Sequence, residues 1–218
     1  MIPLSVPNLG GNEWKYIKDC LDTNWVSSVG SYVDRFEKSL AEFTGAKHAV
    51  ATVNGTAALH ISLLLAGVGQ GDLVIAPNIT FIASINSITY CGANPVLIDI
   101  DERTWQMDLN LLEEFLKKET SIRSKKCFHE KSGRRISAIM PVHVLGNMCD
   151  MSRLMTLAKK YFLAIVEDAT EALGSSYKQK HAGTFGSVSA STGGALLQSI
   201  AEPFHVHQSL DTTVPFCM

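Results

Sequence analysis

Short runs of apolar residues, rich in valine and isoleucine, recur along the chain, and stretches with helical periodicity lie between them. The runs have few polar residues at alternate positions, which is typical of strands that are buried on both faces of a parallel sheet. They predict strands over residues 48–53, 72–77, 94–100, 136–142 and 162–168. The stretches between them predict helices over residues 56–66, 84–90, 109–118 and 151–161.

Because the predicted strands and helices alternate, the chain is expected to fold as an α/β protein whose mostly parallel sheet is sandwiched by helices. Residues 46–186 hold this pattern. Residues 1–45 predict an N-terminal helical segment instead, with Gly45 as a helix stop. Two apolar stripes at helical spacing support that segment: Trp14, Ile17 and Leu21, and then Phe36, Leu40 and Phe43.

Two stretches depart from this pattern. Residues 119–135 are polar and basic, and we expect them to form a surface loop between a helix and a strand. Residues 187–218 form a divergent tail without lysine or arginine, although the rest of the chain carries 19 such residues. The tail has no clear period, and only residues 195–202 favour a short helix, so we expect it to be poorly packed.

Length and charge limit the class of protein. At 218 residues and 46% hydrophobic content, the chain is long enough to bury a sizeable core. Its 19 basic and 21 acidic residues give a formal charge of −2, which argues against nucleic acid or an anionic membrane as a partner. The first residues do not resemble a signal peptide, and no stretch approaches the ~20 apolar residues that span a bilayer. A cytoplasmic protein is therefore expected.

Cysteine and histidine patterns predict neither a disulfide framework nor a metal site. The 5 cysteines are scattered and include no CxxC pair. The "HVH" at residues 205–207 offers two histidines without further ligands, which is too few for tight metal binding.

The candidate site follows from the fold, because ligands of open α/β sheets bind at the carboxyl ends of the strands. The first predicted strand is followed by "NGTAALHISLLLAG", a glycine turn that opens an apolar helix. A helix amino end favours an anion, and small residues let backbone N–H groups approach it, so Thr56 and Ala57 are candidates to hold a phosphate. A capped helix, with Asn54 or Thr56 as the cap, explains the same residues.

Aromatic, imidazole and acidic residues follow the other predicted strands. Phe81 follows the second strand and suits either stacking on a planar ring or packing in the core. His143 follows the fourth strand. The stretch "IVEDATEAL" ends the last strand with Asp168 and Glu171. A sheltered carboxylate there can pair with a cationic ring nitrogen, but an aspartate that caps a helix fits the same pattern.

In combination, these strand ends resemble the DegT/DnrJ/EryC1/StrS family of sugar aminotransferases, which use pyridoxal 5′-phosphate on the aspartate-aminotransferase scaffold. The resemblance covers residues 2–186 and rests on segments in matching order and spacing. They read "TNWVSSVGSYVDRFEKSLAEFTGAKHAVATVNGTAALHISL", "APNITFIASINSI", "PVLIDID", "PVHVLGNMCDM" and "VEDATEALGSSYKQKHAGTFG". The resemblance implies the cofactor-binding large domain of this family, here partial and over residues 46–186, with the small C-terminal domain absent.

The resemblance also implies roles for the strand-end residues. Thr56 and Ala57 would hold the cofactor phosphate, and Gly55 would allow the turn before them. Phe81 would stack on the pyridine ring. Asp168 would pair with the protonated ring nitrogen and so keep the ring an electron sink.

The partners are likewise implied by the resemblance. The family acts on nucleotide-linked keto-sugars, with glutamate as the usual amino donor, and its active sites form between two subunits, which implies a homodimer.

Glu171 occupies a position near the ring hydroxyl where the family often has glutamine or histidine, so this chain departs from the family pattern there.

The lysine that binds the cofactor as a Schiff base in this family is missing from the sequence. Family members continue from a "GTFG" like residues 183–186 into an "SF" pair, then a lysine, then a glycine-rich run. This chain continues "SVSASTGGALLQSI", and no lysine occurs after Lys180. Lys178 and Lys180 lie upstream of the expected place. We therefore predict no catalytic lysine, an incomplete large domain that lacks the sheet strands expected after the lysine, and a chain that is inactive.

Two hypotheses follow from these observations. The first is a nucleotide-sugar aminotransferase chain that carries the cofactor-binding half and is truncated or altered after about residue 186. The second is a non-catalytic binding or regulatory homologue that dimerises with an intact paralogue through the N-terminal helices. A lysine-free dehydratase that uses histidine instead fits less well, because no residue from 187 to 197 is histidine.

Overall fold

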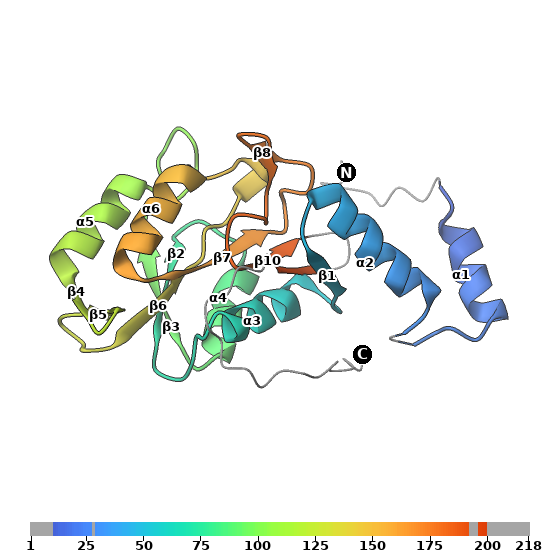
Figure 1. Ribbon diagram of the computed structural model, residues 1–218, viewed down its shortest axis with the longest axis horizontal. Helices are drawn as coiled ribbons and strands as arrows, with labels where there is room; N and C mark the ends of the chain where they lie inside the picture. The colour runs from blue at the N-terminus through green and yellow to red at the C-terminus, as the bar shows by residue number, and fades with distance from the viewer. Residues whose placement is uncertain (1–10, 28, 192–195, 200–218) are drawn as a thin grey trace, which may run out of the picture.

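The structure is a computed structural model that describes residues 11–27, 29–191 and 196–199 (Figure 1). Its helices are α1 (Glu13–Asp22), α2 (Ser31–Thr44), α3 (Gly55–Leu65), α4 (Ile82–Tyr90), α5 (Leu109–Glu119), the 3-10 turn η1 (Val144–Gly146) and α6 (Met151–Tyr161). Its strands are β1 (His48–Ala51), β2 (Leu73–Pro77), β3 (Asn94–Ile98), β4 (Thr120–Arg123), β5 (Lys126–His129), β6 (Arg135–Ile139), β7 (Ala164–Ala169), β8 (Ser176–Tyr177), β9 (Lys180–His181), β10 (Val188–Ser191) and β11 (Leu196–Ser199).

One sheet forms the centre of the fold, with the strand order β1-β11-β10-β7-β6-β2-β3. Strands β3, β2, β6, β7 and β10 are parallel, whereas β11 is antiparallel to both β10 and β1. A hairpin of β4 and β5 pairs with the start of β6, and β8 and β9 form a separate ribbon. The mostly parallel α/β fold predicted from the sequence is confirmed.

Alternate residues of the central strands pack on opposite faces of this sheet. In β2, Leu73 and Ile75 belong to the hydrophobic core under α5 and α6, whereas Val74 and Ala76 belong to the core under α3 and α4. Figure 1 shows these two pairs of helices on opposite sides of the sheet. Burial on both faces explains why the strands read as continuous apolar runs.

Helix α5 illustrates how the sequence specifies one of these covering helices. The Asp108 side chain caps it by accepting a hydrogen bond from the N–H of Asn110 at 2.7 Å. Leu109, Leu112 and Leu116 recur at helical spacing and are buried against the sheet. One capping residue and one apolar stripe are therefore enough to specify where this helix begins and which of its faces is buried.

Residues 119–135 contain the β4–β5 hairpin where the sequence predicts a surface loop. Its two strands are joined by Ser124 and Lys125, which have φ angles of 49° and 57°. Positive φ at both central positions is the property of a type I′ turn, whose twist matches that of the strands it joins. Asn-Gly is the usual signal for such a turn, so Ser-Lys did not indicate it.

The sheet also continues beyond residue 186, and this corrects the prediction for the tail. Strand β10 lies parallel to β7 and its four residues are buried, so the expected poor packing is wrong for residues 188–191. Residues 196–199 form strand β11, not part of a helix. Backbone pairing with β7 stabilises β10 although its small side chains show little periodicity. The "HVH" motif lies outside the described residues.

The N-terminal helices lie at the end of the molecule away from α5 (Figure 1). Helix α2 packs on β1 through Leu40 and Ala49, and it stops at Gly45, whose φ of 74° is left-handed. Helix α1 has no buried residue, and its stripe of Trp14, Ile17 and Leu21 is exposed. No helix within the described ranges is long and apolar enough to cross a membrane.

Gly186 is a position where only glycine fits, and this gives a test of the packing between the β9–β10 turn and β7. A Cβ atom there would lie 2.5 Å from the backbone oxygen of Ile165. We expect Gly186→Ala to destabilise the protein by about 1–3 kcal/mol, because backbone must shift to accommodate it. Gly69 is the control, since a Cβ there meets no atom within 4 Å. Equal urea midpoints for Gly186→Ala and Gly69→Ala would contradict this packing.

Candidate active site

Strand β7 carries two consecutive carboxylates that point to opposite faces of the sheet. Ile165 belongs to the core under α5 and α6, and Val166 belongs to the core under α3 and α4. Strand alternation therefore directs Glu167 to the first face and Asp168 to the second. Glu167 is fully buried and Asp168 is 3% exposed, so each carboxylate requires hydrogen-bond donors from the protein or from a ligand.

Asp168 lies among hydroxyl groups on the α3–α4 face. Its Oδ1 accepts hydrogen bonds from the N–H and the hydroxyl of Thr170, at 3.2 and 2.6 Å. Its Oδ2 accepts one from the hydroxyl of Ser84 at 2.6 Å. Ser84 is fully buried on α4 and its hydroxyl lies 2.6 Å from that of Thr80. Since a carboxylate has about four lone-pair sites, one site at Oδ2 remains open within the described part of the chain.

Glu167, in contrast, fastens the turn that leads from β9 to β10. Its Oε1 accepts hydrogen bonds from the N–H groups of Phe185 and Gly186, both at 2.6 Å. Its Oε2 accepts one from the N–H of Gly183 at 3.0 Å and lies 3.2 Å from Nε2 of the buried His143. These four donors occupy its acceptor sites, so Glu167 has a structural role and is closed to a ligand.

Helix α3 begins beside the Asp168 cluster. The Asn54 side chain caps it by accepting a hydrogen bond from the N–H of Ala57 at 2.9 Å, so of the two alternatives for the cap Asn54 is correct. Within the described residues, the N–H groups of Gly55 and Thr56 have no acceptor and stay open to an anion. A Cβ atom at Gly55 would lie 3.2 Å from the methyl group of Thr170, so a side chain there would crowd the residue that holds Asp168.

Phe81 and Glu171 are both at the surface. Phe81 precedes the first turn of α4 and is 75% exposed, so its ring does not pack in the core and is free to stack on a ligand. Glu171 is exposed, and its Oε2 accepts a hydrogen bond from the N–H of Leu145 at 2.7 Å. Leu145 has a φ of 55°, so Glu171 supports an unusual backbone conformation in the turn after β6.

Two residues that the sequence pattern did not indicate, Ser84 and Thr170, join the predicted site residues. Thr170 contacts Asp168 and lies against Gly55, and Ser84 links Asp168 to the helix that follows Phe81. The Asp-x-Thr spacing is one local signal that could have predicted the Thr170 contact. Ser84 lies 84 positions from Asp168 in the chain, and no local pattern predicts that contact.

The two lysines nearest to the missing catalytic position make contacts elsewhere. The Lys178 ammonium donates a hydrogen bond to the hydroxyl of Ser152 on α6, at 2.9 Å. The Lys180 ammonium lies 4.7 Å from the centre of the Phe185 ring, where a cation–π interaction is favourable. Both side chains are exposed, and neither contact involves Asp168 or the hydroxyl groups around it.

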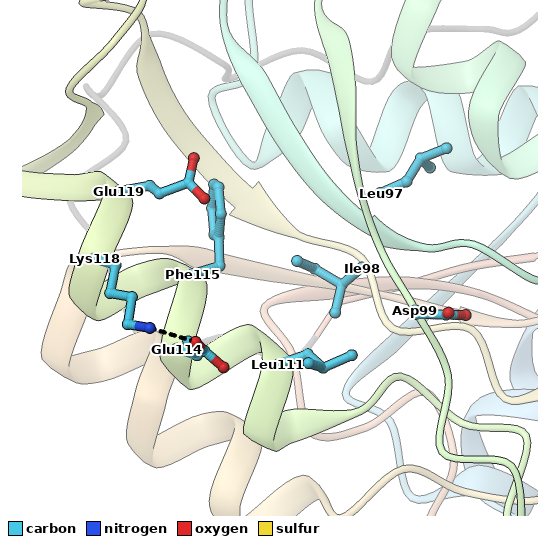
Figure 2. Close-up of a pocket in the computed structure, with 8 residues that line it drawn as sticks. All are labelled: Leu97, Ile98, Asp99, Leu111, Glu114, Phe115, Lys118 and Glu119. Carbon is cyan, nitrogen blue, oxygen red and sulfur yellow. Dashed lines mark hydrogen bonds and ion pairs between the residues drawn. The ribbon is translucent and has the colours of Figure 1, made fainter.

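A hollow also lies between β3 and α5, away from this cluster. Its lining is mixed, apolar and charged: Leu97, Ile98, Asp99, Leu111, Glu114, Phe115, Lys118 and Glu119. Figure 2 shows Lys118 turned toward Glu114, with which it pairs, so these two charges satisfy each other. Strands β2 and β6 separate β3 from β7, and the hollow shares no residue with the Asp168 site.

The fold and the geometry describe an α/β protein with a candidate ligand site at the carboxyl ends of parallel strands, where a buried carboxylate lies beside a helix amino end. The chain belongs to the DegT/DnrJ/EryC1/StrS aminotransferase family, whose family model matches residues 7–192. The resemblance found in the sequence is therefore confirmed.

Curated relatives include GDP-perosamine synthases. That of Caulobacter vibrioides is 44% identical over 185 residues, which cover 85% of this chain and 46% of the relative. The putative pyridoxal phosphate-dependent aminotransferase EpsN of Bacillus subtilis is 37% identical over 185 residues, which cover 85% of this chain and 45% of the relative. The chain thus spans about half the length of the curated relatives it matches.

Solved structures with a similar fold include aminotransferases. The aminotransferase from Psychrobacter cryohalolentis superimposes with a TM-score of 0.76 at 30% identity, over 91% of this chain and 50% of that chain. The PLP form of the putative sugar aminotransferase Spr1654 from Streptococcus pneumoniae has a TM-score of 0.77 at 28% identity, over 93% of this chain and 54% of that chain.

Replacing Glu167 tests its structural role. We expect Glu167→Gln to lower the free energy of unfolding by about 3 kcal/mol, because an amide nitrogen cannot accept from the N–H groups that surround it. Glu171→Gln is the matched control, since Glu171 is exposed and accepts a single hydrogen bond. Urea unfolding measures both. If the two variants lose the same small stability, the assignment of Glu167 as the anchor of the β9–β10 turn is wrong.

Proposed function

We propose that this chain is the cofactor-binding part of a pyridoxal 5′-phosphate-dependent aminotransferase that acts on a nucleotide-linked keto-sugar, with an amino donor such as glutamate. The observation that carries the proposal is the buried Asp168 carboxylate, which keeps one acceptor site open beside the amino end of α3. Relatives named GDP-perosamine synthase and a neighbour titled a sugar aminotransferase in its PLP form support the substrate and cofactor classes.

The residues of the site fit this cofactor. Asp168 would accept the N–H of a protonated pyridine ring at its open site. The N–H groups of Gly55 and Thr56, at the positive end of the α3 dipole, would hold the phosphate. This differs from the role that the resemblance implies for Ala57, whose N–H donates to Asn54 instead. When bound, the cofactor withdraws electrons from the carbon at which a proton is removed or added during amino transfer.

Phe81 and Glu171 complete the set in this proposal. The exposed Phe81 ring would cover one face of the pyridine and exclude water from it. Glu171 would lie at the side of the ring hydroxyl, where it fastens the Leu145 turn beside the site. Its contact with the Leu145 backbone supports a positioning role for Glu171.

The chain as given would hold the cofactor without a covalent bond. Its sequence has no lysine after Lys180, and the contacts that Lys178 and Lys180 make with Ser152 and Phe185 do not involve Asp168. Because the family uses a lysine to move protons, we propose that these 218 residues bind the cofactor but do not catalyse amino transfer.

Binding of pyridoxamine 5′-phosphate tests this function, because that form needs no lysine to bind. We expect Asp168→Asn to weaken binding by about tenfold to a hundredfold in titration calorimetry, since a charged acceptor is lost. Asp99→Asn is the control, because Asp99 also follows a parallel strand but is exposed. No binding by the unaltered chain, or equal binding by both variants, would contradict the proposal.

A second candidate function is carried by the exposed stripe of α1, formed by Trp14, Ile17 and Leu21. These side chains are 73%, 52% and 58% exposed, although their spacing is that of a buried helix face. We propose that the stripe packs on a second subunit, either another copy in a homodimer or an intact paralogue that supplies the catalytic lysine. In the latter case this chain acts as a non-catalytic homologue.

Light scattering after size-exclusion chromatography tests the stripe. We expect Ile17→Ser to weaken self-association by tenfold or more, because burial of an isoleucine contributes about 1.5–3 kcal/mol. Lys18→Ser is the control on the same helix, since Lys18 pairs with Asp22 at the surface. A chain that is monomeric at all concentrations argues against a homodimer, and failure to bind an intact paralogue would then exclude the second candidate function.

A further inference from the structure

We propose that Ser84 is a positioning residue that assigns the ring nitrogen of the ligand to one atom, Oδ2 of Asp168. This inference rests on the proposed function, because it concerns how the same carboxylate receives a pyridine ring. Ser84 lies on α4, three residues after Phe81, and contacts Asp168 across 84 positions of the chain.

The hydrogen bonds around Asp168 distinguish its two oxygens. Oδ1 accepts two bonds, both from Thr170, whereas Oδ2 accepts only the bond from Ser84 within the described residues. Each carboxylate oxygen has about two lone-pair sites, so Oδ1 is filled and Oδ2 keeps one site. Only Oδ2 can therefore accept a hydrogen bond from a ring N–H, and it does so while it also accepts one from the Ser84 hydroxyl.

The direction of the Ser84 bond is fixed by its neighbours. An ionised carboxylate only accepts, so the single hydroxyl proton of Ser84 goes to Asp168. The contact of 2.6 Å between Thr80 and Ser84 then has the Thr80 hydroxyl as the donor, and this contact is shorter than the 3.3 Å from the same hydroxyl to the backbone oxygen of Phe81. The result is a chain of hydroxyl groups, from Thr80 to Ser84 to Asp168, in which each proton points toward the carboxylate and holds it in one orientation.

The position of Ser84 gives this bond a functional consequence. Helix α4 begins after Phe81, the ring proposed to stack on the ligand, and carries Ser84 within its first turn. One helix thus sets both the plane of the ligand ring and the orientation of the acceptor for its nitrogen. Ser84 is fully buried, so water does not replace its hydroxyl as the donor to Asp168.

The test compares two ligands and two serines. Pyridoxamine 5′-phosphate carries the ring nitrogen, and its carbocyclic analogue has a CH group in place of that nitrogen. We expect Ser84→Ala to weaken binding of pyridoxamine 5′-phosphate about tenfold while binding of the analogue changes less than about twofold. Thr80→Val acts through Ser84 and is expected to give the same selectivity with a smaller loss, of about threefold.

Ser87→Ala is the matched control. Ser87 lies on the same helix and is equally buried, but its hydroxyl donates to the backbone oxygen of Ser84 at 2.7 Å and does not contact Asp168. We expect it to leave the ratio of the two affinities unchanged. Thr80 is only partly buried, so Thr80→Val gives the same readout if Ser84→Ala does not fold.

The outcomes separate this inference from the function on which it rests. If the unaltered chain binds pyridoxamine 5′-phosphate but Ser84→Ala weakens both ligands equally, Ser84 has a merely structural role and the inference is overturned. If the unaltered chain binds neither ligand, the proposed function fails, and the inference fails with it. A selective loss in Ser84→Ala and Thr80→Val, absent from Ser87→Ala, supports the assignment.

Discussion

The alternation of side chains along β7 is the constraint on which the site depends. Glu167 and Asp168 are neighbours in sequence, yet they enter opposite cores because successive strand residues point to opposite faces. Glu167 meets four protein donors and is satisfied. Asp168 meets three and keeps one acceptor site open. This difference of one donor separates a carboxylate that holds the fold from one that can hold a ligand.

The surrounding elements make that open acceptor part of a candidate site. Thr170 fills one oxygen of Asp168 and packs against Gly55, which brings the amino end of α3 to the carboxylate. Helix α4 contributes Ser84 from the other side. Glu167 stabilises the site indirectly, because it fixes the turn that delivers β10 to the edge of β7. Both carboxylates therefore support the same candidate site. Asp168 offers the acceptor atom, and Glu167 holds the turn that places β10 beside β7.

Much of the fold could be predicted from the sequence, because the signals for its helices and parallel strands are local. The stripe of Leu109, Leu112 and Leu116 and the cap at Asp108 together specify α5 without knowledge of its neighbours. The hairpin at residues 119–135 was missed because its turn uses Ser124 and Lys125 at positive φ. Strand β10 was missed because pairing with β7, and not its own periodicity, stabilises it.

Residues of the candidate site that directly follow a predicted strand could be found from the sequence. Residues that reach the site only through a contact between distant parts of the chain could not. Thr56, Ala57 and Asp168 became candidates through the rule that strand ends bind ligands, and the family resemblance implied their roles and that of Gly55. Ser84 could not be predicted, because a serine in an apolar helix is unremarkable until the fold brings it to Asp168. The capping bond from Asn54 to Ala57 was one of two open alternatives, and it changes which N–H groups are available to a phosphate.

We propose that the chain holds its cofactor through Asp168 and α3 without a lysine. The most direct measurement is an absorbance spectrum with added pyridoxal 5′-phosphate, followed by borohydride reduction, intact mass and peptide mapping. We predict a spectral change that dialysis reverses and no adduct concentrated at one lysine. A stoichiometric adduct fixed by reduction at a single site, such as Lys178 or Lys180, would contradict the account. It would mean that this lysine binds the cofactor covalently and that the chain can catalyse amino transfer.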